Sequence, residues 1–396
     1  MARARNRKLS LKAKIINLNM VALAKFWYLS TVFPIPDWEL QSTERLIFKY
    51  LWDIPDDELG NEPVARNTIY LPKERGGLAL LHPVHQSTAL RFKFFAKIVD
   101  PECTAKWVFL ARYWLGNPLG LLDPTWAFLR GNHLPRPDRP RYPEYYVDCL
   151  HLLQNTPDLI KKAWDTAVIR KHILAQDPTK PNAHDEWPRL GLTITDAQWK
   201  KAWSGIYSTM ATGFQQDTHY LFMHVALYTN LFTSKFGKTS RFCSYCSHEK
   251  GNNCEENIFH LFFECSVAKK VWNKVTPLLK LIMNTNNIRR TSILFNDFPD
   301  GTPNHIKNLT LTTSQIILQR IWLNRNEYLH QNKPPDIDGS KTKIFDSVMN
   351  MVVAQYNIYK GRKQLQKFQK RFCIYNGEFC FLDATRKPKF PYLNTL

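Results

Sequence analysis

The sequence predicts a mainly α-helical protein, and three observations support this fold class. Apolar residues recur at helical spacing from residue 11 to residue 29. Two long segments near the C-terminus, 305–332 and 340–372, continue the same periodicity. The sequence contains no internal repeat, and only the short stretches 68–83 and 372–382 are typical of β-hairpins. We therefore expect many helices and very little sheet.

Residues 1–100 are expected to form the first domain. Ser10 stands where the N-cap of the first helix belongs, and that helix ends before the Pro-Ile-Pro sequence at 34–36. A second helix is predicted over about 38–52, followed by a polar loop. In the stretch 68–83, Gly76 and Gly77 separate two apolar runs, as the turn of a hairpin would. Helical spacing resumes from 84 to 99.

The remaining chain divides into three further predicted segments. Residues 101–190 form a connector that is rich in Pro, Gly and Trp, and its aromatic residues favour an irregular packed segment over disorder. Residues 191–280 are predicted to be a helical domain, in which Thr195 or Asp196 caps a helix. Residues 281–396 form a helical extension that ends strongly basic, since 360–389 contain nine Lys or Arg and two acids.

Composition restricts the class of protein and its partners. The 396 residues carry 54 Lys and Arg against 34 Asp and Glu, a net charge of +20 that suits a polyanion such as nucleic acid. Eight cysteines are too few for a disulfide framework, so we expect an intracellular protein. No apolar run reaches the roughly 18 residues of a membrane span. The basic N-terminus is predicted to be an amphipathic helix, because Asn17, Asn19 and Lys25 interrupt any leader-like apolar run.

Cysteine and histidine cluster between residues 241 and 272. Cys243 and Cys246 form a Cys-x2-Cys knuckle, and His260 and Cys265 supply a nitrogen and a third sulfur. Together they fill a tetrahedron around one Zn²⁺. Four protein ligands leave no open coordination position, so the predicted ion is structural and would hold a helix starting near Glu255 against the turn at residue 242.

Alternatives to this ligand set remain open in the sequence. Cys254 could replace His260, although it lies in a Gly- and Asn-rich loop. His248 follows Cys246 by only two residues, which is too close for a comfortable chelate. Buried cysteines without a metal are a third interpretation. Cys373 and Cys380 lack partner histidines, and we place them in the C-terminal hairpin rather than in a second metal site.

The cluster and several other stretches resemble one family. The sequence CSYC followed by ENIFHLFFECSVAKKVW is similar to the reverse transcriptase zinc-binding domain of non-LTR (LINE-type) retrotransposon polyproteins, and the resemblance includes apolar Leu261, Phe262, Ala268 and Trp272. Residues 9–36 and 45–52 resemble the thumb-like helices after the polymerase palm, and 68–83 resembles the hairpin that follows them. The sequence RIWLNRNEYLH at 320–330 is similar to a Trp-x2-Arg-Asn helix beyond the knuckle.

The resemblance implies a role in target-primed reverse transcription. Such a segment would grip template RNA and target DNA, in the nucleus, beside the polymerase part of the polyprotein. The family's polymerase centre needs paired aspartates on a hydrophobic hairpin. The adjacent pair in this chain, Asp56 and Asp57, lies in a polar loop. Asp336 and Asp338 with nearby lysines suggest a nuclease centre only weakly, and helix-capping is the better interpretation. We therefore expect no enzyme activity.

Basic residues at both ends are the predicted phosphate contacts. Tyr245 and Phe242 beside the knuckle are predicted to stack on unpaired bases, and the alternative is ordinary packing. Two other interpretations stay open for the whole chain: a zinc module that binds a protein partner, and a truncated retroelement copy without function. The cationic candidates are Arg3, Arg5, Arg7, Lys8, Lys12 and Lys14, and Arg362, Lys363, Lys367, Lys370 and Arg371.

Overall fold

Helices dominate the computed structural model, which confirms that the protein is mainly α-helical. Among its described residues, the one sheet has two short strands. None of the described helices combines the length and the apolar character needed to cross a bilayer. The structure describes residues 8–31, 35–58, 60–100, 102–116, 165–175, 178–237, 240–250 and 253–391.

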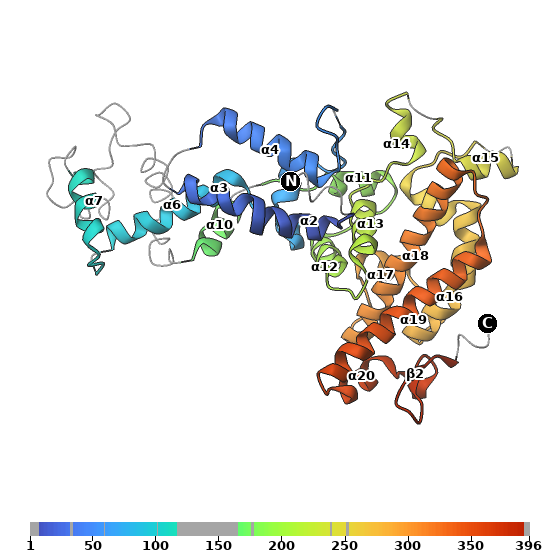
Figure 1. Ribbon diagram of the computed structural model, residues 1–396. Helices are drawn as coiled ribbons and strands as arrows, with labels where there is room; N and C mark the ends of the chain where they lie inside the picture. Colours follow the sequence, from blue (N-terminus) through green and yellow to red (C-terminus); the bar gives the residue numbers. More distant parts are fainter. Residues whose placement is uncertain are drawn as a thin grey trace.

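The N-terminal helices form an arm, drawn at the left of Figure 1. The first helix and its cap are confirmed, because Ser10 Oγ accepts a hydrogen bond from the Ala13 amide at 3.3 Å. A π turn at Leu18–Ala22 interrupts this helix. The arm comprises α2 (Leu11–Asn17), α3 (Leu23–Ser30), α4 (Asp37–Leu51), α5 (Arg66–Tyr70), α6 (Pro83–Val99), α7 (Lys106–Gly116) and α10 (Thr166–Ala175).

The hairpin predicted over residues 68–83 is wrong. Its first apolar run ends helix α5, and a 3₁₀ turn at Lys73–Arg75 follows Pro72. Gly76 then reverses the chain with a φ of 85°, which favours glycine. Returning amides bond to Leu71 and Ile69, but no strand forms. Pro72 cannot donate a hydrogen bond to a neighbouring strand, and the segments on both sides of it are helical, so a regular strand pair cannot form.

The larger body lies at the right of Figure 1 and is built around α18. Helices α13, α16 and α19 all pack against this central helix. The predicted N-cap Thr195 is confirmed, since it forms a capping box with Gln198 at the start of α12. The body comprises α11 (Ala183–Arg189), α12 (Asp196–Ile206), α13 (Gly213–Met223), α14 (Asn230–Ser234), α15 (Ser244–Lys250), α16 (Ser266–Met283), α17 (Arg290–Phe295), α18 (Asn304–Gln331), α19 (Ile337–Gly361) and α20 (Leu365–Phe372).

Helix α18 is buried on several sides although much of it is polar. Thr313 and Ser314 are fully buried, and each hydroxyl donates to the carbonyl four residues earlier. Gln315 donates to the Ile206 carbonyl at 2.9 Å and lies 3.1 Å from His219 Nδ1. These bonds satisfy polar groups that would otherwise destabilise the core.

The C-terminal segment differs from the prediction in two places. The helical segment 340–372 breaks after Gly361, where Lys363 has a φ of 55°, so the basic tail forms a separate helix, α20. The hairpin predicted over 372–382 is wrong, because a 3₁₀ turn (Tyr375–Gly377) occupies its centre. Strand β1 (Phe381–Leu382) instead pairs with β2 (Pro388–Lys389), which lies beyond the predicted stretch.

Most of the predicted aromatic connector, residues 117–164, lies outside the described residues. The domain boundaries near 100, 190 and 280 stay predictions. Within the predicted connector, α7 and α10 are helical, and α10 packs against α6.

Candidate metal centre

The first two predicted ligands flank the start of a short helix. Cys243 precedes α15, and Cys246 lies in its first turn. The chain before α15 pairs with the chain after it: the Cys243 amide donates to the Cys254 carbonyl at 2.8 Å, and Phe242 forms an antiparallel bridge with Glu255. This pairing closes the described residues of 240–257 into a compact loop, and the term knuckle refers to this loop below.

The other two predicted ligands lie at the two ends of a π turn, His260–Glu264. The Cys265 amide donates to the His260 carbonyl at 2.7 Å, and Cys265 is also the N-cap residue of α16. Asn257 Oδ1 accepts from the His260 amide at 2.7 Å and so orders the entry to the turn. The wide i→i+5 bond of the π turn brings residues five positions apart close together.

The four side chains converge at distances that fit a tetrahedral zinc ion. All four are buried, and their ligand atoms lie within 4.8 Å of one another. Cys243 Sγ and Cys265 Sγ are 3.8 Å apart, and Cys246 Sγ lies 3.5 Å from His260 Nε2. Zn–S and Zn–N bonds of ordinary length imply separations of about 3.8 Å and about 3.6 Å in a tetrahedron. The residues therefore fit a closed Cys3His site.

The contact between two thiols and burial both raise pKa values at this site. The pKa of Cys243 is raised, first by its hydrogen bond with the Cys265 thiol and then by desolvation. Desolvation is also the main cause of the raised pKa of Cys246. A bound divalent ion would favour the thiolates instead and would release their protons. His260 Nδ1 lies 4.0 Å from Glu264 Oε2, while Nε2 of the same ring lies next to Cys246 Sγ.

The alternative ligands do not join the cluster. Cys254 contributes its backbone carbonyl to the knuckle, and its side chain lies outside the group of four. The side chain of His248 lies outside the described residues. The helix expected to start near Glu255 begins at Ile258 instead, because Glu255 is engaged in the bridge to Phe242.

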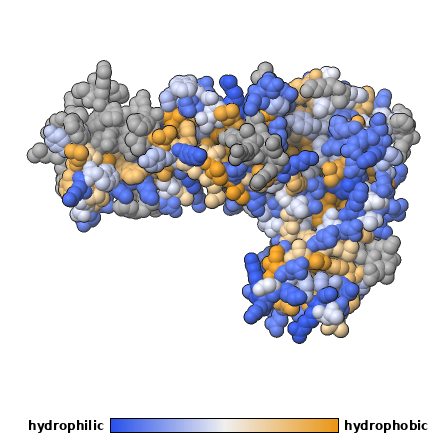
Figure 2. Space-filling view, in the orientation of Figure 1, coloured by the Kyte–Doolittle hydropathy of each residue, from blue (hydrophilic) through white to orange (hydrophobic). Residues whose placement is uncertain are grey.

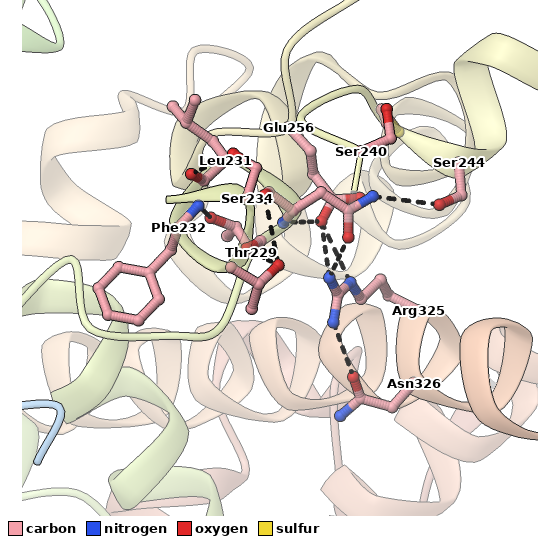
Figure 3. Close-up of polar contacts among 12 residues, drawn as sticks. Thr229, Leu231, Phe232, Ser234, Ser240, Ser244, Glu256, Arg325 and Asn326 are labelled. Carbon is pink, nitrogen blue, oxygen red and sulfur yellow. Dashed lines mark hydrogen bonds and ion pairs between the residues drawn. The ribbon is translucent and has the colours of Figure 1, made fainter. Parts of the chain in front are cut away.

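A buried ion pair fastens the knuckle to the body, as Figure 3 shows. The side chains of Glu256 and Arg325 are 1% and 6% exposed, and Arg325 Nη2 donates to Glu256 Oε1 at 2.9 Å. The Asn230 amide donates to the same carboxylate oxygen at 2.8 Å. Asn230 also receives a bond from Arg325 Nη2 and donates to the Phe242 carbonyl, at 2.8 Å each. One network thus joins α14, the knuckle and α18.

Sequence reasoning missed this network. Arg325 belongs to the Trp-x2-Arg-Asn pattern, and its guanidinium lies 5.2 Å from the ring centroid of Trp322. That pattern was the available signal, but nothing in the sequence identified Glu256 or Asn230 as the partners. They lie 69 and 95 positions away from Arg325 in the chain.

The base-stacking role predicted for Tyr245 is wrong. The residue is 5% exposed, and its ring lies 4.5 Å from the ring of Tyr328, measured between centroids. Its hydroxyl donates to the Asn324 carbonyl at 2.9 Å. Tyr245 therefore docks α15 onto α18. Phe242 is half-buried beside the guanidinium of Arg241.

The predicted cations differ in their exposure. The prediction that Lys14 contacts phosphate is wrong, because Lys14 is buried. Its Nζ donates to Asp53 Oδ2 at 2.6 Å and to the Leu51 carbonyl at 2.9 Å. Lys8 and Lys12 are exposed. Arg3, Arg5 and Arg7 lie outside the described residues. The exposed cations on and beside α20 are Arg362, Lys363, Lys367, Lys370 and Arg371.

The aspartates considered as possible catalytic groups lie in an exposed turn or at the start of a helix. Asp56 and Asp57 lie exposed on a turn after α4. Asp336 caps α19 by accepting from the Gly339 amide, and Asp338 pairs with Lys274 at 2.9 Å. The helix-capping interpretation is confirmed for Asp336.

In comparisons with protein-family models and with curated proteins, nothing matches this chain. The geometry of the Cys3His group is therefore the main observation on which a functional argument can build.

Proposed function

We propose that this chain is a noncatalytic, zinc-stabilised nucleic-acid-binding protein derived from the C-terminal part of a non-LTR retrotransposon reverse transcriptase. The buried Cys3His group carries the proposal. It occurs in the order Cys-x2-Cys then His-x4-Cys, which resembles the zinc-binding domain of that family. In this interpretation residues 1–100 are the thumb-like segment and residues 281–396 are the helical basic extension.

The proposed metal role is structural. Cys243, Cys246, His260 and Cys265 would complete the coordination shell, which leaves no position for a reactive water. The ion would fix the knuckle against the π turn and the start of α16. Arg325 supports the same arrangement from α18 through its buried bond to Glu256.

The proposed partner is nucleic acid, and the distribution of charge supports it. The net charge is +20, and α20 itself contains no acidic residue. Figure 2 shows hydrophilic residues gathered at the lower end of the body, where Figure 1 places α20. Exposed cations on one short helix can follow a phosphate backbone. In the family's reaction such a surface would grip template RNA or target DNA inside the nucleus.

Binding in rising salt tests the nucleic-acid role. Labelled RNA and DNA should bind with a logarithmic affinity that falls linearly with the logarithm of salt concentration. Replacing Lys363, Lys367 and Lys370 by Gln should weaken binding and flatten the slope. The control variant replaces three exposed lysines elsewhere, Lys25, Lys333 and Lys343. Binding no tighter than in heparin-blocked controls, with a flat salt slope for the unmodified protein, would reject the proposal.

One observation favours a second function, protein binding. Apolar side chains stand exposed along α2 and α3 and the π turn between them, including Met20 at 73% and Tyr28 at 80% exposure. Figure 2 shows apolar residues on this part of the arm. Such a surface suits a protein partner, of which the polymerase part of the polyprotein is the proposed example. Capture of that part in the presence of nuclease would favour this function.

A further inference from the structure

A cleft of about 370 Å³ lies between α16 and α17, next to the metal centre. Its volume falls within the roughly 300–1,000 Å³ that small-ligand sites occupy. One wall is a single face of α16, because Lys269, Trp272, Asn273 and Lys280 follow one another at helical spacing. The opposite wall includes the chain before α17 and Arg290.

The floor of the cleft is aromatic and fixed in place. The rings of Trp272 and Phe263 stack with centroids 5.5 Å apart and planes 19° apart. Trp272 Nε1 donates to the Phe262 carbonyl at 2.7 Å, so the indole has a defined orientation. Phe262 and Phe263 belong to the π turn that joins His260 to Cys265. The floor is therefore preorganised by the same turn that carries two predicted zinc ligands.

The rim of the cleft is cationic. Lys269, Lys280 and Arg290 are exposed, and the residues lining the cleft include no Asp or Glu. Arg290 is anchored, because its guanidinium lies 5.4 Å from the ring centroids of both Phe259 and Phe263. Three cations with no carboxylate among the lining residues favour an anionic ligand. The indole and the amide side chains in the same lining favour an anion that also carries a planar group.

We propose that this cleft binds an unpaired nucleotide of a single-stranded nucleic acid. The base would stack on Trp272, and the flanking phosphates would lie beside Lys269, Lys280 and Arg290. Asn273 and Asn287, which also line the cleft, would meet the polar edge of the base. A duplex keeps its bases paired and cannot offer one to the floor. The inference rests on the proposed nucleic-acid function and names the part of the protein that distinguishes single strands from duplexes.

Photocrosslinking with a single-stranded oligonucleotide that carries 5-iodouridine tests the contact directly. The expected product is a crosslinked peptide containing Trp272, found by mass spectrometry. A single strand should compete for this crosslink, whereas a duplex of the same sequence should not. Crosslinks confined to other peptides, or equal competition by the duplex, would overturn the inference.

Affinity measurements on two variants complete the test. Trp272→Leu should weaken single-strand binding about ten-fold and leave duplex binding unchanged. Trp107→Leu on α7 is the matched control, and it should change neither. Because Trp272 also bonds to the π turn, the exposed pair Lys269→Gln/Lys280→Gln provides a variant that does not disturb the fold. This double variant should reduce the slope of log affinity against log salt for single strands by about 0.7 for each phosphate that the protein no longer neutralises. The control pair Lys333→Gln/Lys343→Gln should leave that slope unchanged.

The outcomes separate this inference from the proposed function. If the α20 variant weakens binding while the Trp272 and Lys269/Lys280 variants bind single strands normally, the cleft is overturned and nucleic-acid binding stands. If the unmodified protein binds neither RNA nor DNA, the proposed function fails as well. An equal loss for single strands and duplexes in the Lys269/Lys280 variant would also overturn the cleft as a site for unpaired nucleotides.

Discussion

The knuckle and the junction between α13 and α18 are stabilised by different interactions. Among the described residues 240–257, the buried ones are Cys243, Tyr245, Cys246 and Glu256, and none of them is aliphatic. The α13–α18 junction instead buries large aromatic and aliphatic side chains such as Phe222 and Ile317. A short loop with so little apolar surface cannot order itself by the hydrophobic effect. We therefore expect an ion at the candidate site, together with the Glu256–Arg325 ion pair, to stabilise the knuckle more than the junction.

Removal of the predicted zinc ion should give the largest difference between the two regions. Structural zinc contributes about 10–16 kcal/mol of apparent binding free energy in zinc-finger peptides. Treating the purified protein with a chelator, or replacing Cys246 by Ser, should therefore abolish amide-exchange protection in residues 241–265. Protection of α13 and α18 should persist. Hydrogen exchange read by mass spectrometry, together with elemental analysis for zinc, measures both.

Cys103→Ser is the matched control for this prediction, because Cys103 is free and lies outside the cluster. It should change neither the zinc content nor the exchange pattern. Equal protection of the knuckle with and without chelator would show that packing alone orders it.

Breaking the ion pair should have the next largest effect. Arg325→Met leaves the Glu256 carboxylate buried without its cation, which costs about 3–5 kcal/mol. Adding Glu256→Gln should recover part of that stability, because it removes the stranded charge. Urea unfolding monitored by circular dichroism measures both variants.

An exposed ion pair provides the control. Arg189→Met disrupts a pair with Glu186 whose side chains are 71% and 41% exposed, and it should change the free energy of unfolding by less than about 1 kcal/mol. Equal costs for the two arginines would contradict the role assigned to the buried pair.

The stability of the protein should depend on pH through Asp217, a buried residue of α13 that bonds to α2 in the arm. Burial raises the pKa of Asp217 to about 7, against its bonds to the Leu11 amide and the nearby charge of Lys14. The folded state thus favours the protonated carboxyl, so its stability is greatest below the unfolded pKa and falls as pH rises through 7. The expected loss is about 2.5 kcal/mol between pH 5 and pH 7.5.

Asp217→Asn tests this prediction, because the amide keeps an oxygen for Leu11 and carries no charge. The melting temperature of the variant should exceed that of the unmodified protein at pH 7.5, and the difference should shrink toward pH 5. A difference that does not change with pH would assign the effect to packing and not to ionisation.

The smallest expected effect concerns the contact between α15 and α18. Tyr245→Phe removes the hydroxyl that donates to the Asn324 carbonyl and should cost about 1 kcal/mol. Nucleic-acid affinity should stay unchanged, because the ring is buried against Tyr328. A large drop in RNA affinity with unchanged stability would restore the stacking role that the sequence suggested.

Local patterns predicted much of the fold. The helices that begin near Ser10 and after Thr195 were found from their caps, and α4, α6 and α18 from their periodicity. Both predicted hairpins failed, because a glycine turn between apolar runs does not by itself specify a strand ladder. Pro72 and the positive φ of Asn376 give short helical turns at those two places instead.

The candidate metal site was predictable because its chemistry is local. Cys243, Cys246, His260 and Cys265 lie within twenty-three consecutive positions, and thiolate and imidazole spacing alone limits how they can meet. The supporting network was not predictable. Its members, Asn230, Glu256 and Arg325, come from three separate segments, and a buried charge in a sequence looks the same as an exposed one.

The sequence by itself determined the helices, the basic character and the four convergent ligands, because each depends on residues that are close along the chain. Only the tertiary structure decided which cations are free: Lys14 is buried against Leu51, while Lys367 and Lys370 face solvent on α20. It also buried Tyr245 and brought Trp272 and Arg290 to one cleft. The reason is that exposure depends on which distant segments pack against a side chain, and residue type and spacing do not encode that directly.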